Sequence, residues 1–595
     1  MTQQRIAAEL PPAPEATVPQ GAVAFRFPAI AVAGLALLVR LAVLAGTQGL
    51  PFFRGPIGDA KAYLDWSARI AAGDWLGRAE GLFYQAPLYP YLLASLRATF
   101  GLDGALLAVR LLQIGFAAFA CGVLVEIGAR AHSRAAGLAS GLALALYAPS
   151  IVLDVQLAKE SLVVSLGVLA LGVLLAAARA PGVGLIFGAG VLLGAICLLR
   201  ESALLLAAAV GVWTWIAFPG DGQLTAATPA SRQRSGARAR RLLLWGAGLL
   251  LMLAPVATRN FVVGGELALT TAQAGPNFYI GNHAGATGSY TPLRAGRGDA
   301  QFERRDATEL AEAARGERLS ARAVSAYWFS RGFGFWRNEP IAAASLLVRK
   351  LRLALQAEEI TDIEADWIYA RASPLLRALG YFGHFGVLAP LALMGLLWDW
   401  RGLPARDRTL LLAWLGAAFA GLVLFYVLGR YRALVFPPLF LLAGIAISRL
   451  ASCIGRRRRL PGTWTGIAFA ASGLLVFFAN GPGRFASPPA PAEANLALAY
   501  ALEGRFAEAE DAYRRALALD PEHFGARLGL GNLLLVGGRS VAALPHLERA
   551  AALQPQDVDA RRQLAIAAEA VRASSTAPSG AGDRLPRGSE GERAP

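Results

Sequence analysis

The sequence predicts an all-α, polytopic membrane protein of about eleven transmembrane helices, followed by a small C-terminal α-solenoid. The chain has 595 residues, of which 55% are hydrophobic and only 16% are charged, whereas soluble chains carry roughly 25% charged residues. Apolar runs long enough to cross a bilayer recur along the chain, and a sequence repeat follows residue 480. This composition excludes a soluble enzyme, and the chain is too apolar to be mainly disordered.

The apolar runs define the predicted spans. Residues 1–23 are rich in Pro and Ala, and we expect them to be disordered without a cleavable signal peptide, because the first apolar run already has the length of a membrane span. The run over 88–100 is too short to span and predicts an interfacial helix. The stretch 183–218 also admits one long helix interrupted at Arg200. The predicted spans are 25–46, 104–127, 135–153, 161–179, 183–199, 202–218, 242–258, 376–398, 409–428, 433–451 and 463–480.

The distribution of Arg predicts the orientation. The formal net charge is +16, and Arg residues gather in the short loops 128–134, 219–241, 399–408 and 452–460. With eleven spans these loops all fall on one side, which the positive-inside rule makes cytoplasmic. The charge therefore indicates membrane topology and not nucleic-acid binding. The opposite face is predicted to lie outside the cytoplasm.

A repeat follows the last predicted span. Residues 481–492 form a Pro-rich linker. Four small or helix-ending residues then recur with an offset of 34 residues, which is the tetratricopeptide period. They are Gly504, Ala509, Ala516 and Pro521, followed by Gly538, Ala543, Ala550 and Pro555. The sequence thus predicts a tetratricopeptide domain over 493–573 that binds a protein partner, and a disordered tail over 574–595.

Several ionisable residues interrupt the apolar pattern. Arg40 lies inside the first span and must face the bundle or a polar cavity, because a charge facing lipid is costly. In the first outer loop, Asp59 and Tyr63 share one helix face at a spacing of four residues. The alternative is that the aromatic residues of this loop only anchor it in the interface. A second outer turn contains Asp154, Lys159 and Glu160.

Further polar residues lie at the ends of other spans. Arg200 stands at a helix junction beside Glu201, with which it could form a simple ion pair. Two Arg flank a Tyr in an outer turn, against the positive-inside bias, and guanidinium groups bind phosphate oxygens well. The residues of this group are Arg259, Asn260, Asn282, Arg430, Tyr431 and Arg432. Three Cys and five His show no metal-ligand spacing, so no metal site is predicted.

The outer-loop residues resemble a known family. The pattern Asp59-x-x-x-Tyr63, then Gly73-Asp74-Trp75, then an aromatic run around Pro87, is similar to the first periplasmic loop of polyprenyl-phosphate-dependent glycosyltransferases of the GT-C fold. The branch is family 39, with the protein O-mannosyltransferases and the lipid A aminoarabinose transferases. The resemblance implies a GT-C-like domain over 24–480 with a large periplasmic segment over 259–375. Gln85-Ala86 departs from the acid-basic pair of the aminoarabinose transferases, so another Arg or Lys would have to contact the phosphate.

The resemblance implies a glycosyltransferase that moves a hexosyl or pentosyl group from a polyprenyl-phosphate-linked donor to a periplasmic acceptor. Its implied site comprises three groups of residues. These are catalytic Asp59, Glu160 and Asp154; phosphate-binding Lys159, Arg259, Arg430 and Arg432; and substrate-binding Tyr63, Arg200, Asn260, Asn282 and Tyr431. No cofactor is predicted, and a need for a divalent metal is left open.

Two other functions fit the same sequence. A membrane scaffold could present the repeats for assembly of an envelope complex without catalysing a reaction. A polymerase or ligase could act on lipid-linked oligosaccharides. A transporter is disfavoured, because the polar groups collect at one face and not at the midplane of paired broken helices.

Overall fold

The computed structural model describes residues 26–217, 230–294, 297–298, 300–361, 363–398, 402–455, 470–474 and 490–576. Every regular element in these ranges is helical, which confirms the predicted all-α class. The predicted N-terminal segment 1–23, most of the span 463–480 and most of the linker 481–492 lie outside the described residues, as do Arg456 to Arg459. Helix α24 extends to Thr576, past the predicted start of the tail.

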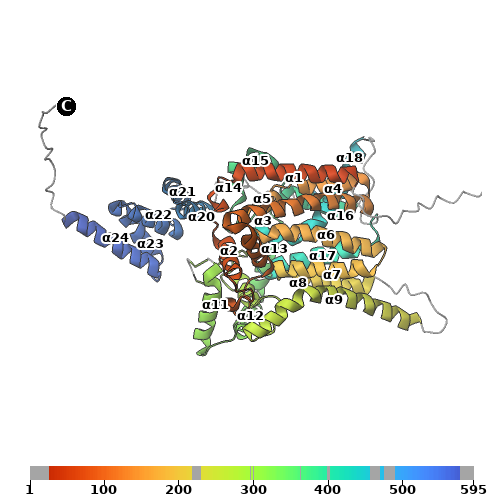
Figure 1. Ribbon diagram of the computed structural model, residues 1–595, viewed down its shortest axis with the longest axis horizontal. Helices are drawn as coiled ribbons and strands as arrows, with labels where there is room; N and C mark the ends of the chain where they lie inside the picture. The colour runs from red at the N-terminus through yellow and green to blue at the C-terminus, as the bar shows by residue number, and fades with distance from the viewer. Residues whose placement is uncertain are drawn as a thin grey trace, which may run out of the picture.

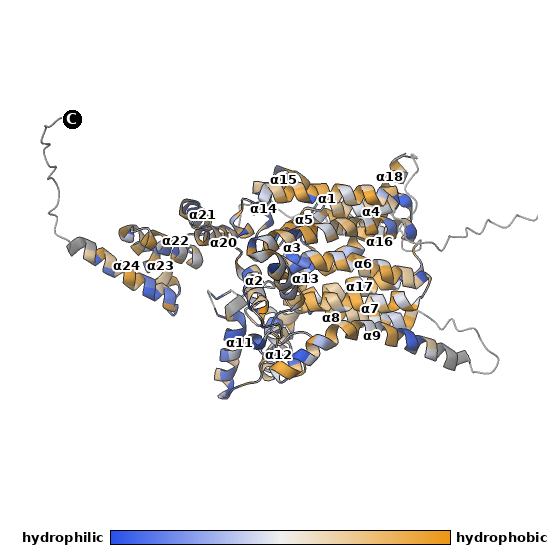
Figure 2. Cartoon of the chain, viewed as in Figure 1, coloured by the Kyte–Doolittle hydropathy of each residue, from blue (hydrophilic) through white to orange (hydrophobic). Residues whose placement is uncertain are grey.

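The body is a bundle of apolar helices whose long axes run side by side (Figure 1). Their apolar residues give the bundle a hydrophobic flank along its whole length (Figure 2). The helices are α1 (Phe27–Thr47), α3 (Leu88–Ala131), α4 (Arg134–Ala145), α5 (Ala148–Val155), α6 (Lys159–Arg179), α7 (Val183–Leu199), α8 (Ala203–Ala217), α9 (Ala230–Gly264), α15 (Pro374–Gly380), α16 (Phe385–Trp398), α17 (Ala405–Leu424) and α18 (Phe436–Gly455).

Six of these helices are long and apolar enough to cross a membrane, or up to eight spans if each bent pair counts as one. The bent pairs are α4 with α5, at 52°, and α15 with α16, at 42°. Helices α7 and α8 are apolar but shorter. They are separate helices, which resolves the ambiguity over 183–218. A left-handed Gly101 (φ 71°) breaks α3 and separates the predicted interfacial stretch from the span that follows it.

One buried ion pair lets the first helix carry a charge inside the bundle. The Arg40 guanidinium donates to Asp154 on α5 at 2.7 Å, and both side chains are almost fully buried. Ser161 on α6 donates to the second Asp154 oxygen at 2.6 Å. Arg40 therefore faces the bundle as predicted, and a buried charge is tolerated because it is both paired and hydrogen-bonded.

Short helices gather at one end of the bundle, where α2, α11 and α12 lie outside the long helices (Figure 1). They come from the first loop, from the segment between α9 and α15 and, in the case of η3, from the connection between α17 and α18. Their bounds are η1 (Pro51–Phe53), α2 (Gly58–Ala71), η2 (Arg78–Glu80), α10 (Ala274–Gly281), α11 (Ala300–Arg315), α12 (Ala321–Asn338), α13 (Pro340–Leu355), α14 (Asp366–Ala372) and η3 (Gly429–Leu434).

A separate stack of helices follows at this same end (Figure 1). Consecutive helices pack as antiparallel pairs around their own apolar core, which contains Ala509, Tyr513, Leu530 and Leu547. We call this stack the repeat domain. Its helices are α20 (Ala490–Leu502), α21 (Phe506–Leu519), α22 (Phe524–Val536), α23 (Ser540–Leu553) and α24 (Val558–Thr576).

Candidate active site

Two cavities meet at the end of the bundle where α2 lies. The larger one, which we call the main cavity, has a volume of about 610 Å³ and is lined by α2, α6, α8, α10, α12, α17 and η3. The smaller one, which we call the acidic cavity, has a volume of about 80 Å³. Asp59, Ile363 and Arg430 line both cavities. The Asp59 carboxylate thus stands at the boundary between the two spaces.

Helix α2 presents Asp59 to this boundary. The residue lies in the first turn of the helix, where the positive end of the helix dipole stabilises a carboxylate. Apolar residues on one side of α2, among them Tyr63 and Ile70, are buried and fix the rotation of the helix. The phenol ring of Tyr63 therefore lies on the cavity side beside Asp59. The pattern of polar and apolar residues in α2 is what aims the carboxylate inward.

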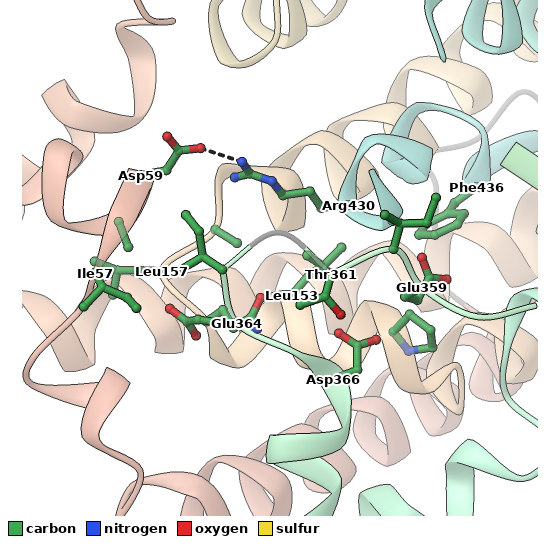
Figure 3. A pocket seen from close by; sticks show the side chains of 17 residues that line it. Ile57, Asp59, Leu153, Leu157, Glu359, Thr361, Glu364, Asp366, Arg430 and Phe436 are labelled. Atoms are coloured by element: carbon green, nitrogen blue, oxygen red, sulfur yellow. Dashed lines mark hydrogen bonds and ion pairs between the residues drawn. The ribbon is translucent and has the colours of Figure 1, made fainter. Parts of the chain in front are cut away.

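Three side chains surround the Asp59 carboxylate. Arg430 donates to Oδ2 at 2.6 Å, and the Gln85 amide donates to Oδ1 at 3.2 Å; Figure 3 shows the pair between Asp59 and Arg430. Burial alone raises the pKa of Asp59, but the charges of Arg430 and Lys159 outweigh it and hold this pKa below its usual value. Asp59 is therefore ionised near neutral pH. Gln85, noted in the sequence only as a departure from a family motif, is one of its hydrogen-bond donors.

Lys159 supplies a cation that forms no ion pair with a carboxylate within the described part of the chain. Its side chain is only slightly exposed, it lines the main cavity, and its Nζ lies 5.5 Å from the centre of the Tyr63 ring. Lys159 is also the first residue of α6, so the positive end of that helix points the same way. An anion in the main cavity would meet both charges.

A second ion pair lies deeper in the main cavity. The Arg200 guanidinium donates to Glu160 at 3.1 Å and stacks 3.5 Å above the centre of the Tyr431 ring. The alternative pairing of Arg200 with Glu201 is wrong, because Glu201 instead accepts a hydrogen bond from Gln273. Glu160, Arg200 and Tyr431 all line the main cavity.

Two other residues singled out in the sequence lie outside both cavities and have structural partners. Asp154 is paired with Arg40, as described above. Arg432 is fully buried between Glu359, at 3.1 Å, and the Leu353 carbonyl, at 2.8 Å. Their charges are satisfied by these partners, so we do not include Asp154 or Arg432 in the candidate site.

Three more residues of the sequence prediction hold loops in place. Arg259 donates to the carbonyls of Leu76, Gly77 and Gly81 and lies 3.6 Å from the centre of the Phe83 ring. Asn260 donates to two carbonyls of the next turn, each at 3.0 Å. Asn282 bridges the Leu424 carbonyl, Trp336 and Lys350. Asn260 and Asn282 thereby hold residues that line the main cavity, and none of the three side chains lines it.

The main cavity contains residues that the sequence analysis missed. Asn277, Tyr290, Glu303 and Tyr426 come from the segment after α9 and from the end of α17. Gln273 and Glu201 join them through their hydrogen bond. Polar residues within the long segment 259–375 were a signal, but their spacing did not indicate which of them would face one cavity.

One side of the main cavity is apolar. Leu204 and Leu205 of α8, Phe329 and Phe333 of α12 and Leu424 of α17 line it. Leu205 is 37% exposed and Phe333 is 52% exposed. The cavity therefore combines a charged floor with an apolar wall.

The acidic cavity is lined by three more carboxyl groups, Glu359, Glu364 and Asp366, which point into it (Figure 3). Burial raises the pKa of Glu364 to about 7 and that of Asp366 well above its usual value. These groups therefore carry less negative charge than their number suggests. Within the described residues, no group of three or more His, Cys, Asp or Glu side chains is arranged to hold a metal ion.

Residues 490–523 match the tetratricopeptide repeat family. This segment forms the helix pair α20 and α21, and the next pair repeats it with the offset of 34 residues. The C-terminal helices are a tetratricopeptide domain. The predicted α-solenoid is therefore confirmed.

No curated protein is similar enough in sequence to match the chain. Among solved structures, the oligosaccharyltransferase AglB of Archaeoglobus fulgidus, in complex with an inhibitory peptide and a dolichol-phosphate, aligns with a TM-score of 0.41 and 13% identity. The alignment covers 81% of this chain and 59% of AglB, so this chain spans about three fifths of that protein. ArnT of Cupriavidus metallidurans, bound to undecaprenyl phosphate, aligns with a TM-score of 0.40 and 15% identity over 92% of this chain and 78% of its own.

Proposed function

We propose that the chain is a membrane glycosyltransferase that uses a polyprenyl-phosphate-linked sugar. One observation carries the proposal, namely that a single cavity of about 610 Å³ joins a floor of ionised groups to an apolar wall. Its volume lies in the range of about 300–1,000 Å³ that is typical of ligand sites. A donor with a charged phosphate and an isoprenoid chain has these same two chemical parts.

In this proposal the cations of the floor bind the donor phosphate. Lys159 offers an ammonium that forms no ion pair with a carboxylate of the described chain, and Arg430 is paired with Asp59. Both would stabilise the negative charge that develops on the leaving phosphate. The isoprenoid chain would lie along Leu205, Phe333 and their neighbours.

Asp59 would act on the acceptor as a general base. An acceptor hydroxyl attacks the anomeric carbon of the sugar and gives its proton to the Asp59 carboxylate. The bond between that carbon and the phosphate oxygen breaks, and its electron pair leaves with the polyprenyl phosphate. Glu160 would support the site through Arg200, to which it is paired. The acceptor would lie on the periplasmic side of a bacterial inner membrane.

The test compares two isosteric substitutions on the same helix. Asp59→Asn should reduce transfer by at least ~100-fold, because general acid–base catalysis contributes on the order of 10²–10⁴, while the amount of protein in the membrane should not change. Asp65→Asn is the control, because Asp65 is exposed and pairs with Lys61 on the surface. The readout is mass spectrometry of envelope glycans and glycoproteins from cells with each variant and from cells without the gene.

Envelope glycans that are unchanged by Asp59→Asn but altered by loss of the gene would contradict the proposed chemistry. That result would favour the non-enzymatic scaffold. Identification of the accumulated lipid-linked donor in the Asp59→Asn strain would separate transfer of a single sugar from polymerase or ligase activity.

A further inference from the structure

The repeat domain is joined to the body through its first helix. Ala492, Leu496 and Ala499 of α20 are fully buried. They belong to one apolar cluster with residues of η1, α5 and α14, including Phe52 and Ile368. Separation of α20 from the body would expose this surface to water, which is unfavourable. Helix α20 is therefore as much a part of the body as of the repeats.

A buried carboxylate reinforces this joint. The side chain of Glu493 on α20 is 1% exposed, and its two oxygens accept from two different arginines. Arg371 on α14 donates at 3.0 Å, and Arg515 on α21 donates at 2.9 Å. One carboxylate thus links the body, the first repeat helix and the second. Loss of either partner would leave a charge poorly compensated in a buried place, which is costly.

The same helix reaches the loop between the two cavities. The Asn495 amide donates to the Ile363 carbonyl at 3.0 Å. The side chain of Ile363 lines both cavities and packs on Gly58, where a Cβ would overlap its Cδ1 atom. Gly58 has a φ of +58° and directly precedes Asp59. A short chain of contacts therefore runs from Asn495 through Ile363 and Gly58 to the candidate catalytic carboxylate.

The repeat domain also holds the chain that leads into α2. The Arg505 guanidinium donates to the Gly49 carbonyl at 2.9 Å. The side chain of Glu503 packs against Gly55, close to the start of α2. Contacts from the repeat domain thus touch the segment that enters α2 at several points.

From these contacts we propose that α20 is a positioning element of the transfer site. It holds Ile363 against Gly58 and thereby fixes the position of the Asp59 carboxylate. Asn495 and Ile363 are positioning residues, because neither carries a reacting group. The inference rests on the proposed function, since it assigns Asp59 to the transfer. It also means that the first repeat helix and the transfer site are mechanically coupled.

The first arm of the test probes the position of residue 59 and needs no sugar donor. The full-length protein, with Cys121, Cys197 and Cys453 replaced by Ala, carries Asp59→Cys and is labelled in membrane vesicles with a water-soluble maleimide. Addition of Asn495→Asp keeps the size of the side chain but turns the donor that faces the Ile363 carbonyl into an acceptor. Labelling of the cysteine at position 59 should become several-fold faster. The matched control is Asp65→Cys on the exposed side of α2, whose labelling rate should not change.

The second arm measures transfer in cells by mass spectrometry of the envelope glycans, with Asp59 intact. Asn495→Asp and Ile363→Ala should each lower transfer by about 10- to 100-fold, because a displacement of the order of 1 Å can cost about 10² in rate. Asn495→Gln, which keeps an amide donor, should restore part of it. Asn532→Asp is the control, because Asn532 lies on α22, which packs mainly on other repeat helices.

Equal labelling at position 59 in the presence and absence of Asn495→Asp would overturn the positioning proposal, whatever the outcome of the Asp59→Asn test. Faster labelling together with unchanged transfer would also overturn it, since the carboxylate would then move without consequence. Faster labelling with reduced transfer and partial recovery by Asn495→Gln would support it. The labelling arm needs no donor, so failure of the proposed function alone would leave its result intact.

Discussion

At the scale of single residues, the pair between Asp59 and Arg430 determines how the site responds to pH. The pKa of Asp59 is lowered because the Arg430 and Lys159 charges outweigh the effect of burial. A carboxylate that serves as a base is active only above its pKa. The activity should therefore persist to a pH below the usual range of an Asp side chain and fall as the carboxylate is protonated.

Arg430→Gln should move the acid limb of the pH profile to higher pH, because burial then raises the pKa of Asp59 with only Lys159 and the Gln85 hydrogen bond left to oppose it. The measurement is the pH profile of sugar transfer in membrane vesicles. Arg430→Lys keeps a positive charge and should leave the limb closer to that of the unchanged protein. If the acid limbs of the Arg430→Gln and Arg430→Lys variants lay at the same pH, Asp59 would not be the group that titrates.

The sequence indicated several side chains of the main cavity because ionisable residues at the ends of apolar helices are costly unless they have a task. Asp59, Lys159, Glu160, Arg200 and Arg430 were found in this way. The same reasoning also selected Asp154 and Arg432, which lie outside both cavities and are held by buried partners. Those partners are Arg40 and Glu359, at separations of 114 and 73 residues, and no local spacing reveals such pairs.

At the scale of elements, glycines decide how closely two helices approach. Gly190 of α7 and Gly248 of α9 face each other's backbones, and a Cβ at Gly190 would overlap the Trp245 carbonyl oxygen. Small residues of this kind allow close packing within membranes. By contrast, nothing lies within 4 Å of a Cβ built on Gly188 of the same helix.

Gly190→Val should therefore destabilise the bundle, at a cost of about 1–3 kcal/mol for an overpacked site. Gly188→Val introduces the same side chain into open space on α7 and is the matched control. The measurement is the midpoint of thermal unfolding in detergent, followed by size-exclusion chromatography of heated samples. Equal midpoints for the two variants would mean that α7 and α9 do not pack in this way.

Hydropathy was sufficient to predict most of the long helices, because each must be apolar over the thickness of a bilayer. It did not foresee the 52° bend between α4 and α5 or the 42° bend between α15 and α16. Nor did it foresee the helices α10 to α14, because these short helices lack the long apolar stretch that marks a membrane span. The repeats were predictable from a period of 34 residues, whereas their burial against α14 was not.

At the scale of the whole molecule, the repeat domain and the main cavity lie at the same end of the bundle (Figure 1). Helix α18 starts at this end, beside η3, and runs to the other. Gly455, at the end of α18, and Ala490, at the start of α20, thus lie at opposite ends of the bundle. This arrangement requires the repeats and Asp59 to lie on the same side of the membrane.

A reporter enzyme that is active only outside the cytoplasm should therefore be active when fused after Thr576. The same reporter inserted into the turn between α6 and α7 should be inactive, because that turn lies at the other end of the bundle. Both fusions need equal amounts of protein in the membrane, measured by immunoblot. Activity at the α6–α7 turn but not after Thr576 would invert the predicted orientation.

The ion pair between Arg40 and Asp154 has a consequence for biosynthesis. The two residues are 114 positions apart, so α1 leaves the ribosome long before its partner on α5 is made. An arginine near the centre of a lone helix costs about 2.5–3.5 kcal/mol on insertion, a cost that the apolar residues of α1 oppose. Until α5 is made, the Arg40 guanidinium has no Asp154 partner. The pairing of α1 with α5 can therefore form only after α5 has joined the bundle.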